Sequence, residues 1–285
     1  MSDYRYYEFL ALDRPLTLGE QSEVRALSAE ADVTATAFTG EYKSGDFGGD
    51  PAAMIERYYD AHLYADGSGS RQVMLRLPTE ALDLGAAEPY LLDEQVEAWV
   101  SGSGDHLVID LLSEEGDGED DDDDGSLALI AEVRADLASG DLRPLYIAWL
   151  AAIGTWERDE NAFDEEFEDE TEPPVPAGLA SPTPSQQALA AFLRLDPDLL
   201  ATAATASAPE RTADPGKLAE WIRALPASEK DALLLRVTGG EAGSARLELL
   251  RRFHNAAEPP ADTLTRRTVA ELLDAAAEAR SSAGR

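Results

Sequence analysis

The chain has 285 residues, 44% of them hydrophobic, and a formal net charge of −34 that results from 57 acidic residues against 23 Lys and Arg. This length is enough for two domains with cores of their own, whereas so few basic residues argue against direct binding of nucleic acid, whose phosphates are recognised by Lys and Arg. The absence of cysteine excludes disulfides, thiolate nucleophiles and cysteine-bound metals, and it is typical of a reducing compartment.

The negative charge is concentrated in the first part of the chain. Residues 211–285 hold 12 basic and 11 acidic residues, so the excess of acids lies almost wholly in residues 1–210. Two runs supply about half of it, because residues 114–124 contain nine acids and residues 157–172 contain ten. Runs of like charge repel themselves and stay solvated, so we expect much of the acidity to lie in loops and linkers.

The sequence carries no membrane or secretion signal that we recognise. Its first residues lack the basic and apolar segments of a signal peptide, and no apolar stretch approaches the ~20 residues that a membrane-spanning helix needs. We therefore expect a cytoplasmic protein without a membrane-bound state.

The first elements alternate between strand and helix. Residues 4–12 are rich in aromatic side chains and predict a strand. Thr17 and Glu20 form a capping box that predicts the start of a helix. The alternating β-branched residues 33–38 predict a second strand, and Asp50 before a proline predicts a short helix to about residue 58.

Two hairpins are expected next, each with a glycine-rich turn between apolar runs. Their predicted strands are residues 62–64 with 73–77, and residues 96–100 with 106–112. The predicted fold class is therefore α+β, with an N-terminal mixed or antiparallel sheet that has helices on one face, followed by an all-α C-terminal domain.

The remaining boundaries follow from composition. The predicted parts are an α+β domain over residues 1–112, an acidic loop over 113–126, a helical pair over 127–156, an acidic and proline-rich linker over 157–182, and an α-helical domain over 183–285. The helical pair has two possible positions, either packed back on the sheet or at the start of the second domain. Within 183–285, a capping residue precedes a proline three times, which is typical of short, well-defined helices.

Asp60 and His62 are the strongest catalytic candidates, although neither is assigned a catalytic role. On a strand the two side chains would share a face, so the carboxylate could orient the imidazole as a general base. The interpretation that we favour is a hydrogen-bonded structural histidine at an aromatic sheet edge.

The acidic run after the sheet raises the question of a metal site. Asp120, Asp122 and Asp124 alternate and precede a glycine, as in a calcium-binding loop. The glutamate that such a loop requires at its twelfth position is replaced by Ala131, so we expect a solvated loop and assign no metal site.

Two sets of side chains are candidates for an interaction surface. Tyr4 and Tyr6 lie on one face of the first predicted strand, together with Glu8, while the other face carries the aromatic residues Tyr7 and Phe9. One face must belong to the core, and the other is a possible contact surface. The second set consists of four arginines that give the last helices a basic face, namely Arg251, Arg252, Arg266 and Arg267.

No phosphate-binding loop, dinucleotide fingerprint, nucleophile elbow or zinc-ligand spacing is present in the sequence. We therefore expect no cofactor and favour a protein that is not an enzyme.

Several segments resemble a family of uncharacterised acidic bacterial proteins. The resemblance is carried by residues 6–16 (YYEFLALDRPL), 74–78 (MLRLP), 140–146 (GDLRPLY), 172–176 (EPPVP) and 195–200 (LDPDLL). It implies an architecture but no activity. It also implies an association with proteins that carry a SWIM-type zinc finger.

Three functional hypotheses from different classes remain. The leading one is a non-enzymatic cytoplasmic interaction protein, an adaptor or regulator, whose partner has a basic surface. The alternatives are an enzyme or small-molecule sensor that uses dispersed carboxylates with His62, and an acidic mimic of nucleic acid.

Overall fold

The computed structural model describes most of the chain. The described residues are 4–28, 30–43, 47–114, 126–155, 170–209, 215–238, 245, 249, 252–253 and 267–283. The acidic run of residues 115–125, with Asp120, Asp122 and Asp124, lies outside them.

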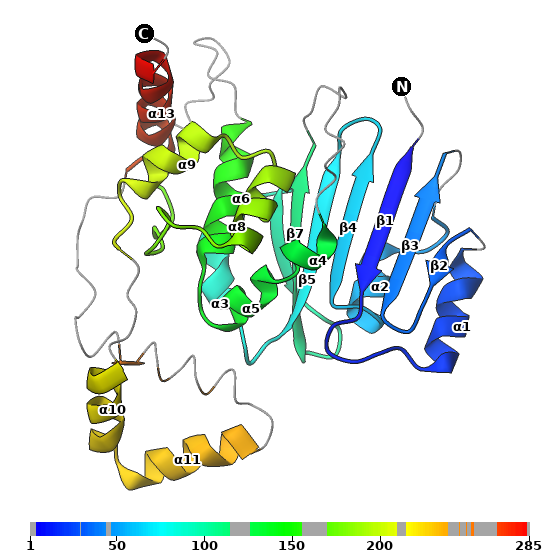
Figure 1. The fold of residues 1–285 in the computed structure, drawn as a ribbon, viewed down its shortest axis with the longest axis horizontal. Helices are drawn as coiled ribbons and strands as arrows, with labels where there is room; N and C mark the ends of the chain where they lie inside the picture. The colour runs from blue at the N-terminus through cyan, green and yellow to red at the C-terminus, as the bar shows by residue number, and fades with distance from the viewer. Residues whose placement is uncertain are drawn as a thin grey trace.

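A seven-stranded sheet forms the N-terminal part of the fold, and every strand pair in it is antiparallel (Figure 1). The strand order is β2-β3-β1-β4-β5-β7-β6. The strands are β1 (Arg5–Leu10), β2 (Asp32–Val33), β3 (Ala37–Tyr42), β4 (Ala61–Asp66), β5 (Arg71–Pro78), β6 (Val96–Val100) and β7 (His106–Ser113). The predicted α+β class with an antiparallel sheet is confirmed.

Both predicted hairpins are present, as the pairs β4–β5 and β6–β7. Their turns contain Gly69 and Gly104, whose φ angles of 101° and 81° are readily adopted only by glycine. In the first turn, Asp66 Oδ1 accepts hydrogen bonds from the backbone N–H groups of Ser68 and Ser70 at 2.9 and 3.0 Å. Local turn chemistry thus fixes the register of both hairpins.

The strand predicted over residues 33–38 differs in the structure, because the chain turns in the middle of that run. Thr34 Oγ1 accepts a hydrogen bond from the Ala37 backbone N–H at 2.9 Å, and Thr34 N–H donates to the Ala37 carbonyl at 2.8 Å. Threonine promotes such turns by bonding to the backbone a few residues ahead. The segment therefore forms the hairpin β2–β3.

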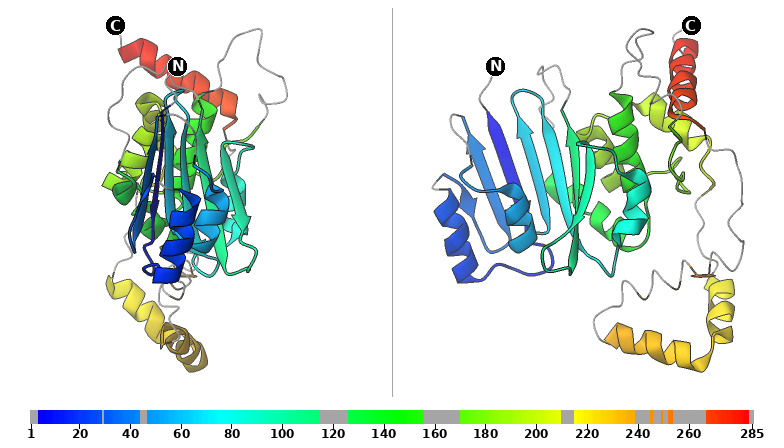
Figure 2. Two further views of the ribbon diagram at one scale, coloured as in Figure 1. Left: turned by 90° about the vertical axis from the view of Figure 1, so that its right-hand side faces the viewer. Right: turned by 180° about the vertical axis from the view of Figure 1, so that it is seen from behind.

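The rear face of the sheet is covered by α1 (Leu18–Leu27) and α2 (Pro51–Arg57), as the view from behind in Figure 2 shows. The predicted capping box of Thr17 and Glu20 is present at the start of α1. Between these helices and the sheet lies an aromatic core that includes Tyr7, Phe9, Phe38, Phe47, Tyr58 and Tyr59.

The front face of the sheet is covered by a second layer of helices. These are α4 (Leu127–Ile130), α5 (Val133–Ala138), α6 (Arg143–Gly154), α8 (Pro184–Phe192) and α9 (Pro197–Ala204), with α13 (Val269–Ala283) packed on α9. The short α3 (Leu84–Ala87) and a 3₁₀ turn (Glu88–Tyr90) lie beside β6 and α6. The remaining described helices are α10 (Pro215–Ala224) and α11 (Ala227–Thr238).

Helices therefore lie on both faces of the sheet, where the sequence led us to expect one face. The reason is the burial pattern of the central strands. On β5, Val73, Leu75 and Leu77 face the front core, while Met74 faces the rear core. A strand that is apolar on both sides needs cover on both sides.

The predicted helical pair over residues 127–156 packs back on the sheet. Leu127, Ile130 and Leu145 belong to the same hydrophobic cluster as Leu75 on β5, and this cluster continues through α8, α9 and α13 to Ala276. A single core thus extends across the predicted linker over residues 157–182.

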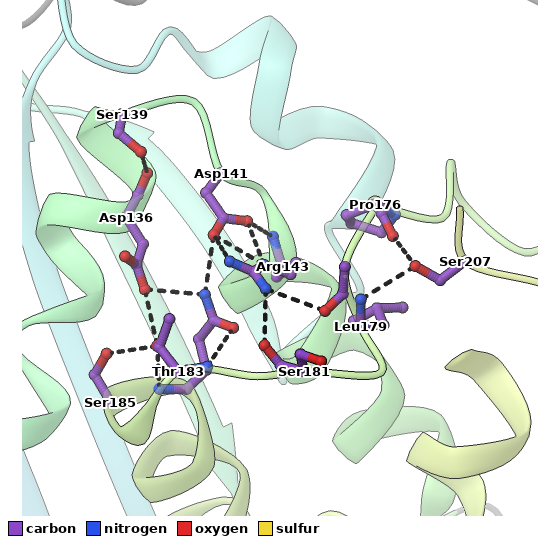
Figure 3. A network of polar contacts seen from close by, with 12 residues as sticks. Asp136, Ser139, Asp141, Arg143, Pro176, Leu179, Ser181, Thr183, Ser185 and Ser207 are labelled. Atoms are coloured by element: carbon purple, nitrogen blue, oxygen red, sulfur yellow. Dashed lines mark hydrogen bonds and ion pairs between the residues drawn. The ribbon is translucent and has the colours of Figure 1, made fainter. Parts of the chain in front are cut away.

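The second half of that linker, from residue 170, contributes to the packing. Arg143 Nη1 donates to the carbonyls of Gly178 and Ser181 at 3.1 and 3.2 Å, and its Nη2 lies 2.7 Å from Asp141 Oδ2. Figure 3 shows this guanidinium between Asp141 and the segment that leads to α8. Proline and acidic residues indicated a spacer, whereas the segment is held by a buried arginine.

Candidate functional site

Asp60 is buried and its carboxylate is fully engaged with groups other than His62. Its side chain is 1% exposed. Oδ2 accepts the backbone N–H groups of Leu12 and Asp13 at 2.7 and 2.9 Å, and Oδ1 accepts Arg76 Nη2 at 2.6 Å. Asp60 therefore fastens the turn after β1 to β5.

His62 is enclosed in the aromatic core of the rear face. Its ring stacks on Phe9 at a centroid distance of 4.0 Å, and Nδ1 lies 2.9 Å from the Glu8 carbonyl oxygen. Because a carbonyl only accepts, Nδ1 carries the proton and Nε2, which has no hydrogen-bond partner, is the bare nitrogen. Burial lowers the pKa of His62 to about 4.

The geometry thus gives no support to a catalytic Asp60–His62 pair. The two side chains have separate partners, and His62 is 0% exposed, so a substrate has no access to it. His62 is hydrogen-bonded and surrounded by aromatic rings, as in the structural interpretation that we favoured from sequence, but it lies on the central strand β4 and not at a sheet edge.

Two of the four candidate arginines can be located, and both are engaged within the chain. Arg267 Nη2 lies 2.8 Å from Glu172 Oε1, and Arg252 Nη2 lies 2.5 Å from Glu229 Oε2. Arg251 and Arg266 lie outside the described residues. Arg267 therefore contacts Glu172, which lies within the predicted acidic and proline-rich linker.

Several carboxylates of the described chain, most of them partly or fully buried, are matched by an arginine. The matched pairs are Asp60–Arg76, Asp13–Arg134, Asp141–Arg143, Glu172–Arg267 and Glu20–Arg14. Such pairing is the ordinary requirement for a carboxylate that is withdrawn from water.

Other partly buried carboxyl groups have no arginine partner among the described residues, and three of them, Glu8, Asp110 and Asp136, share a further property. For each of them the pKa is raised and burial is the main cause. Asp136 accepts hydrogen bonds from Gln186 Nε2 at 2.9 Å and Thr183 Oγ1 at 3.3 Å within the polar network of Figure 3. Burial raises the pKa of Asp110 to about 6, although both of its carboxylate oxygens accept a hydrogen bond from Gln72 Nε2, at 2.9 and 2.8 Å.

Of the three carboxyl groups, Glu8 has the fewest identified hydrogen-bond donors. Its Oε2 accepts the Tyr6 hydroxyl at 3.1 Å, and the described residues include no ion pair to Glu8. Burial, together with the contact to Glu8, raises the pKa of the Tyr6 hydroxyl. Glu8 is thus a half-buried carboxyl group whose only identified donor is a phenol.

Glu8 lies on the front side of β1, opposite Tyr7 and Phe9, at the boundary of the helical layer. Beyond β1, no helix of this layer lies in front of β3 and β2 (Figure 1). The exposed side chains of this surface, which we call the β1–β3 strip, alternate along the two strands and form three cross-strand pairs. These are Tyr6 with Glu41, Glu8 with Thr39, and Leu10 with Ala37. All six are partly or fully exposed.

The two faces of β1 carry the residues that the alternation of a strand predicted. Tyr7 and Phe9 lie in the rear core, while Tyr6 and Glu8 face the other side, as the period of a strand requires. Tyr4, the other candidate tyrosine, precedes β1 and is partly buried. Glu41 was missed, because its relation to Tyr6 depends on the pairing of β1 with β3.

Neither a metal site nor a membrane-spanning element is found in the part of the chain that the structure describes. No group of three or more His, Asp or Glu side chains there is arranged to hold a metal ion. None of the helices there has the length and apolar character to cross a bilayer.

Comparison with known proteins gives no further assignment: no family model, no curated protein and no solved structure matches this chain.

Proposed function

We propose that the protein is a cytoplasmic, non-enzymatic interaction protein, and that its β1–β3 strip binds basic side chains of a partner protein. The observation that carries this proposal is the state of Glu8, a half-buried carboxyl group that has a raised pKa and, among the residues that the structure describes, contacts no cation.

Removal of a carboxylate from water costs free energy unless a counter-charge compensates for it. The same chain meets this requirement with arginine at Asp60, Asp141 and Glu172. At Glu8 an arginine or lysine from outside would supply the missing charge through a charge-assisted hydrogen bond. Glu41 on the neighbouring strand adds a second, fully exposed carboxylate.

The charge of the whole chain favours the same class of partner. A net charge of −34 attracts basic proteins over long distances and repels acidic ones. Proteins with a SWIM-type zinc finger are the partner class that the sequence resemblance implies.

The test is affinity purification of the tagged full-length protein from its native cytoplasm, at low and at high salt. The variants are Glu8→Gln/Glu41→Gln and, as a matched control, Glu97→Gln, which neutralises an exposed carboxylate on the rear face. We expect one stoichiometric basic protein that is lost at high salt and with the double variant but retained by the control. Equal recovery with the double variant would overturn the proposal, as would a chain recovered without partners.

A further inference from the structure

The shape of the β1–β3 strip restricts what can occupy it. At Glu8 and Thr39, the two-residue edge strand β2 widens the two-stranded β1–β3 strip to three neighbouring strands. Strands in a sheet are spaced by about 4.8 Å, so the strip is about 10 Å wide. An α-helix with its side chains has a diameter of about 10–12 Å.

The helices already on the front face show how this layer is built. α4 contacts β1 and β4, α5 contacts β5, and α6 contacts β6 and β7. The layer reaches β1, where Tyr6 and Leu10 pack against the edge of the front core, and no helix of this layer lies in front of β3 and β2 in Figure 1. One additional helix would complete the two-sided cover that the rest of the sheet has.

A partner strand fits this surface poorly. Strand addition requires a free sheet edge with unpaired backbone groups, whereas the strip presents side chains from the face of the sheet. β1 is paired on both sides, with β3 and β4. β2, the edge strand next to the strip, has two residues.

The chemistry of the strip specifies the side chains of such a helix. One end is apolar, because Leu10 pairs with Ala37, while the middle and the other end carry Glu8 and Glu41. These two carboxylates are diagonal neighbours on adjacent strands, which places their positions about 7–8 Å apart. Two long basic side chains one helical turn apart, at positions i and i+4, reach both of them.

We infer that the occupant of the β1–β3 strip is a single amphipathic helix of a partner protein, with Lys or Arg at positions i and i+4 next to an apolar stripe. This inference rests on the proposed function, since it names the partner element at the same site. The helix docks its apolar stripe against Leu10 and Ala37 and places its two cations on Glu8 and Glu41.

Site-specific photo-crosslinking of the full-length protein tests the inference. A photoreactive amino acid replaces Thr39, at the centre of the strip, or Glu97 on the rear face as the control. After irradiation in the native cytoplasm, mass spectrometry identifies the crosslinked segment. A peptide of that segment is then synthesised, its helix content is measured by circular dichroism with and without the protein, and its affinity is determined by titration.

The expected result is a crosslink from position 39 to a segment with the i, i+4 basic pattern, and none to it from position 97. The peptide should gain helix content on binding, and its affinity should fall roughly tenfold or more with Glu8→Gln/Glu41→Gln, while Glu97→Gln leaves it unchanged.

The two proposals fail in different ways. If a basic segment crosslinks at position 39 but binds without helix formation, the inference of a helical occupant is wrong, while the proposed interaction function is retained. A crosslink to another copy of this chain would overturn the partner assignment. The absence of a crosslink specific to position 39, or an affinity that the double variant leaves unchanged, would overturn both.

Discussion

Arg134 on α5 donates from Nη1 and Nη2 to the two carboxylate oxygens of Asp13, a residue 121 positions earlier in the chain. The same guanidinium lies 3.9 Å from Oδ1 of the buried Asp60 and donates from Nε to the Arg76 carbonyl. The turn after β1 is thereby fastened to the helical layer. This contact holds one end of the β1–β3 strip in place.

Asp13→Asn is predicted to lower the free energy of unfolding by about 1 kcal/mol at neutral pH, since the pair is partly exposed and screened by water. The Arg134 contact lowers the pKa of Asp13 in the folded state. Its contribution is therefore complete above the unfolded-state pKa of about 3.9 and is lost as the pH falls through the lower folded-state value. Urea unfolding at several pH values checks this, with the exposed Glu80→Gln as control. A difference between Asp13→Asn and the wild type that persists at the lowest pH would contradict it.

Replacement of Arg267 is predicted to lower the free energy of unfolding more than Asp13→Asn does. Glu172 is 3% exposed and accepts hydrogen bonds from Arg267 and from the Tyr146 hydroxyl. Arg267→Met leaves a buried carboxylate without its cation, and we expect a loss of about 3 kcal/mol in chemical denaturation.

The double variant Arg267→Met/Glu172→Gln removes both charges and provides the control for this pair. It should be more stable than Arg267→Met alone, because no unpaired charge remains buried. If the single and double variants were equally stable, the uncompensated charge would not be the cause.

His62 should remain neutral down to mildly acidic pH. Its folded-state pKa of about 4 lies below the unfolded value of about 6.5. Stability linked to His62 is therefore complete above about pH 6.5 and is lost as the pH falls through about 4, a change of roughly 3 kcal/mol. NMR titration of the imidazole resonances measures this directly. A pKa near 6.5 would show that the ring contacts water.

The stability linked to Asp110 should be lost as the pH rises, whereas the stability linked to His62 is lost as the pH falls. Burial raises the pKa of Asp110 to about 6, so its ionisation destabilises the fold as the pH rises from about 4 through 6. Asp110→Asn is expected to stabilise the protein by about 2–3 kcal/mol at pH 8 and to be neutral at about pH 3, below the unfolded-state pKa. Thermal or urea unfolding at the two pH values checks this, and an equal effect at both would contradict it.

Local signals in the sequence predicted local structure well. The capping box at Thr17, the turn at Gly69 and the placement of Tyr6 and Tyr7 on opposite faces of a strand all depend on residues close together in the chain, and all three are present. The turn at Thr34 interrupts an alternating pattern that is otherwise typical of a strand, so the β2–β3 hairpin was not foreseen.

Contacts between distant segments could not be predicted in the same way. Glu172 lies in an acidic, proline-rich run, and its partner Arg267 is 95 residues away. Asp60 and His62 do share a strand period, but their partners Arg76 and Glu8 come from neighbouring strands. The composition of a segment does not show which distant residues will contact it, and the partners of these side chains come from other parts of the fold.

The most direct test of the account is carboxyl footprinting of the full-length protein, free and with its captured partner. Carbodiimide labelling followed by mass spectrometry compares the reactivity of Glu8 and Glu41 on the strip with that of Glu97 on the rear face. We predict that the partner protects Glu8 and Glu41 and leaves Glu97 unchanged. Protection of Glu97 with unchanged labelling of Glu8 and Glu41 would contradict the assignment of the β1–β3 strip as the binding surface.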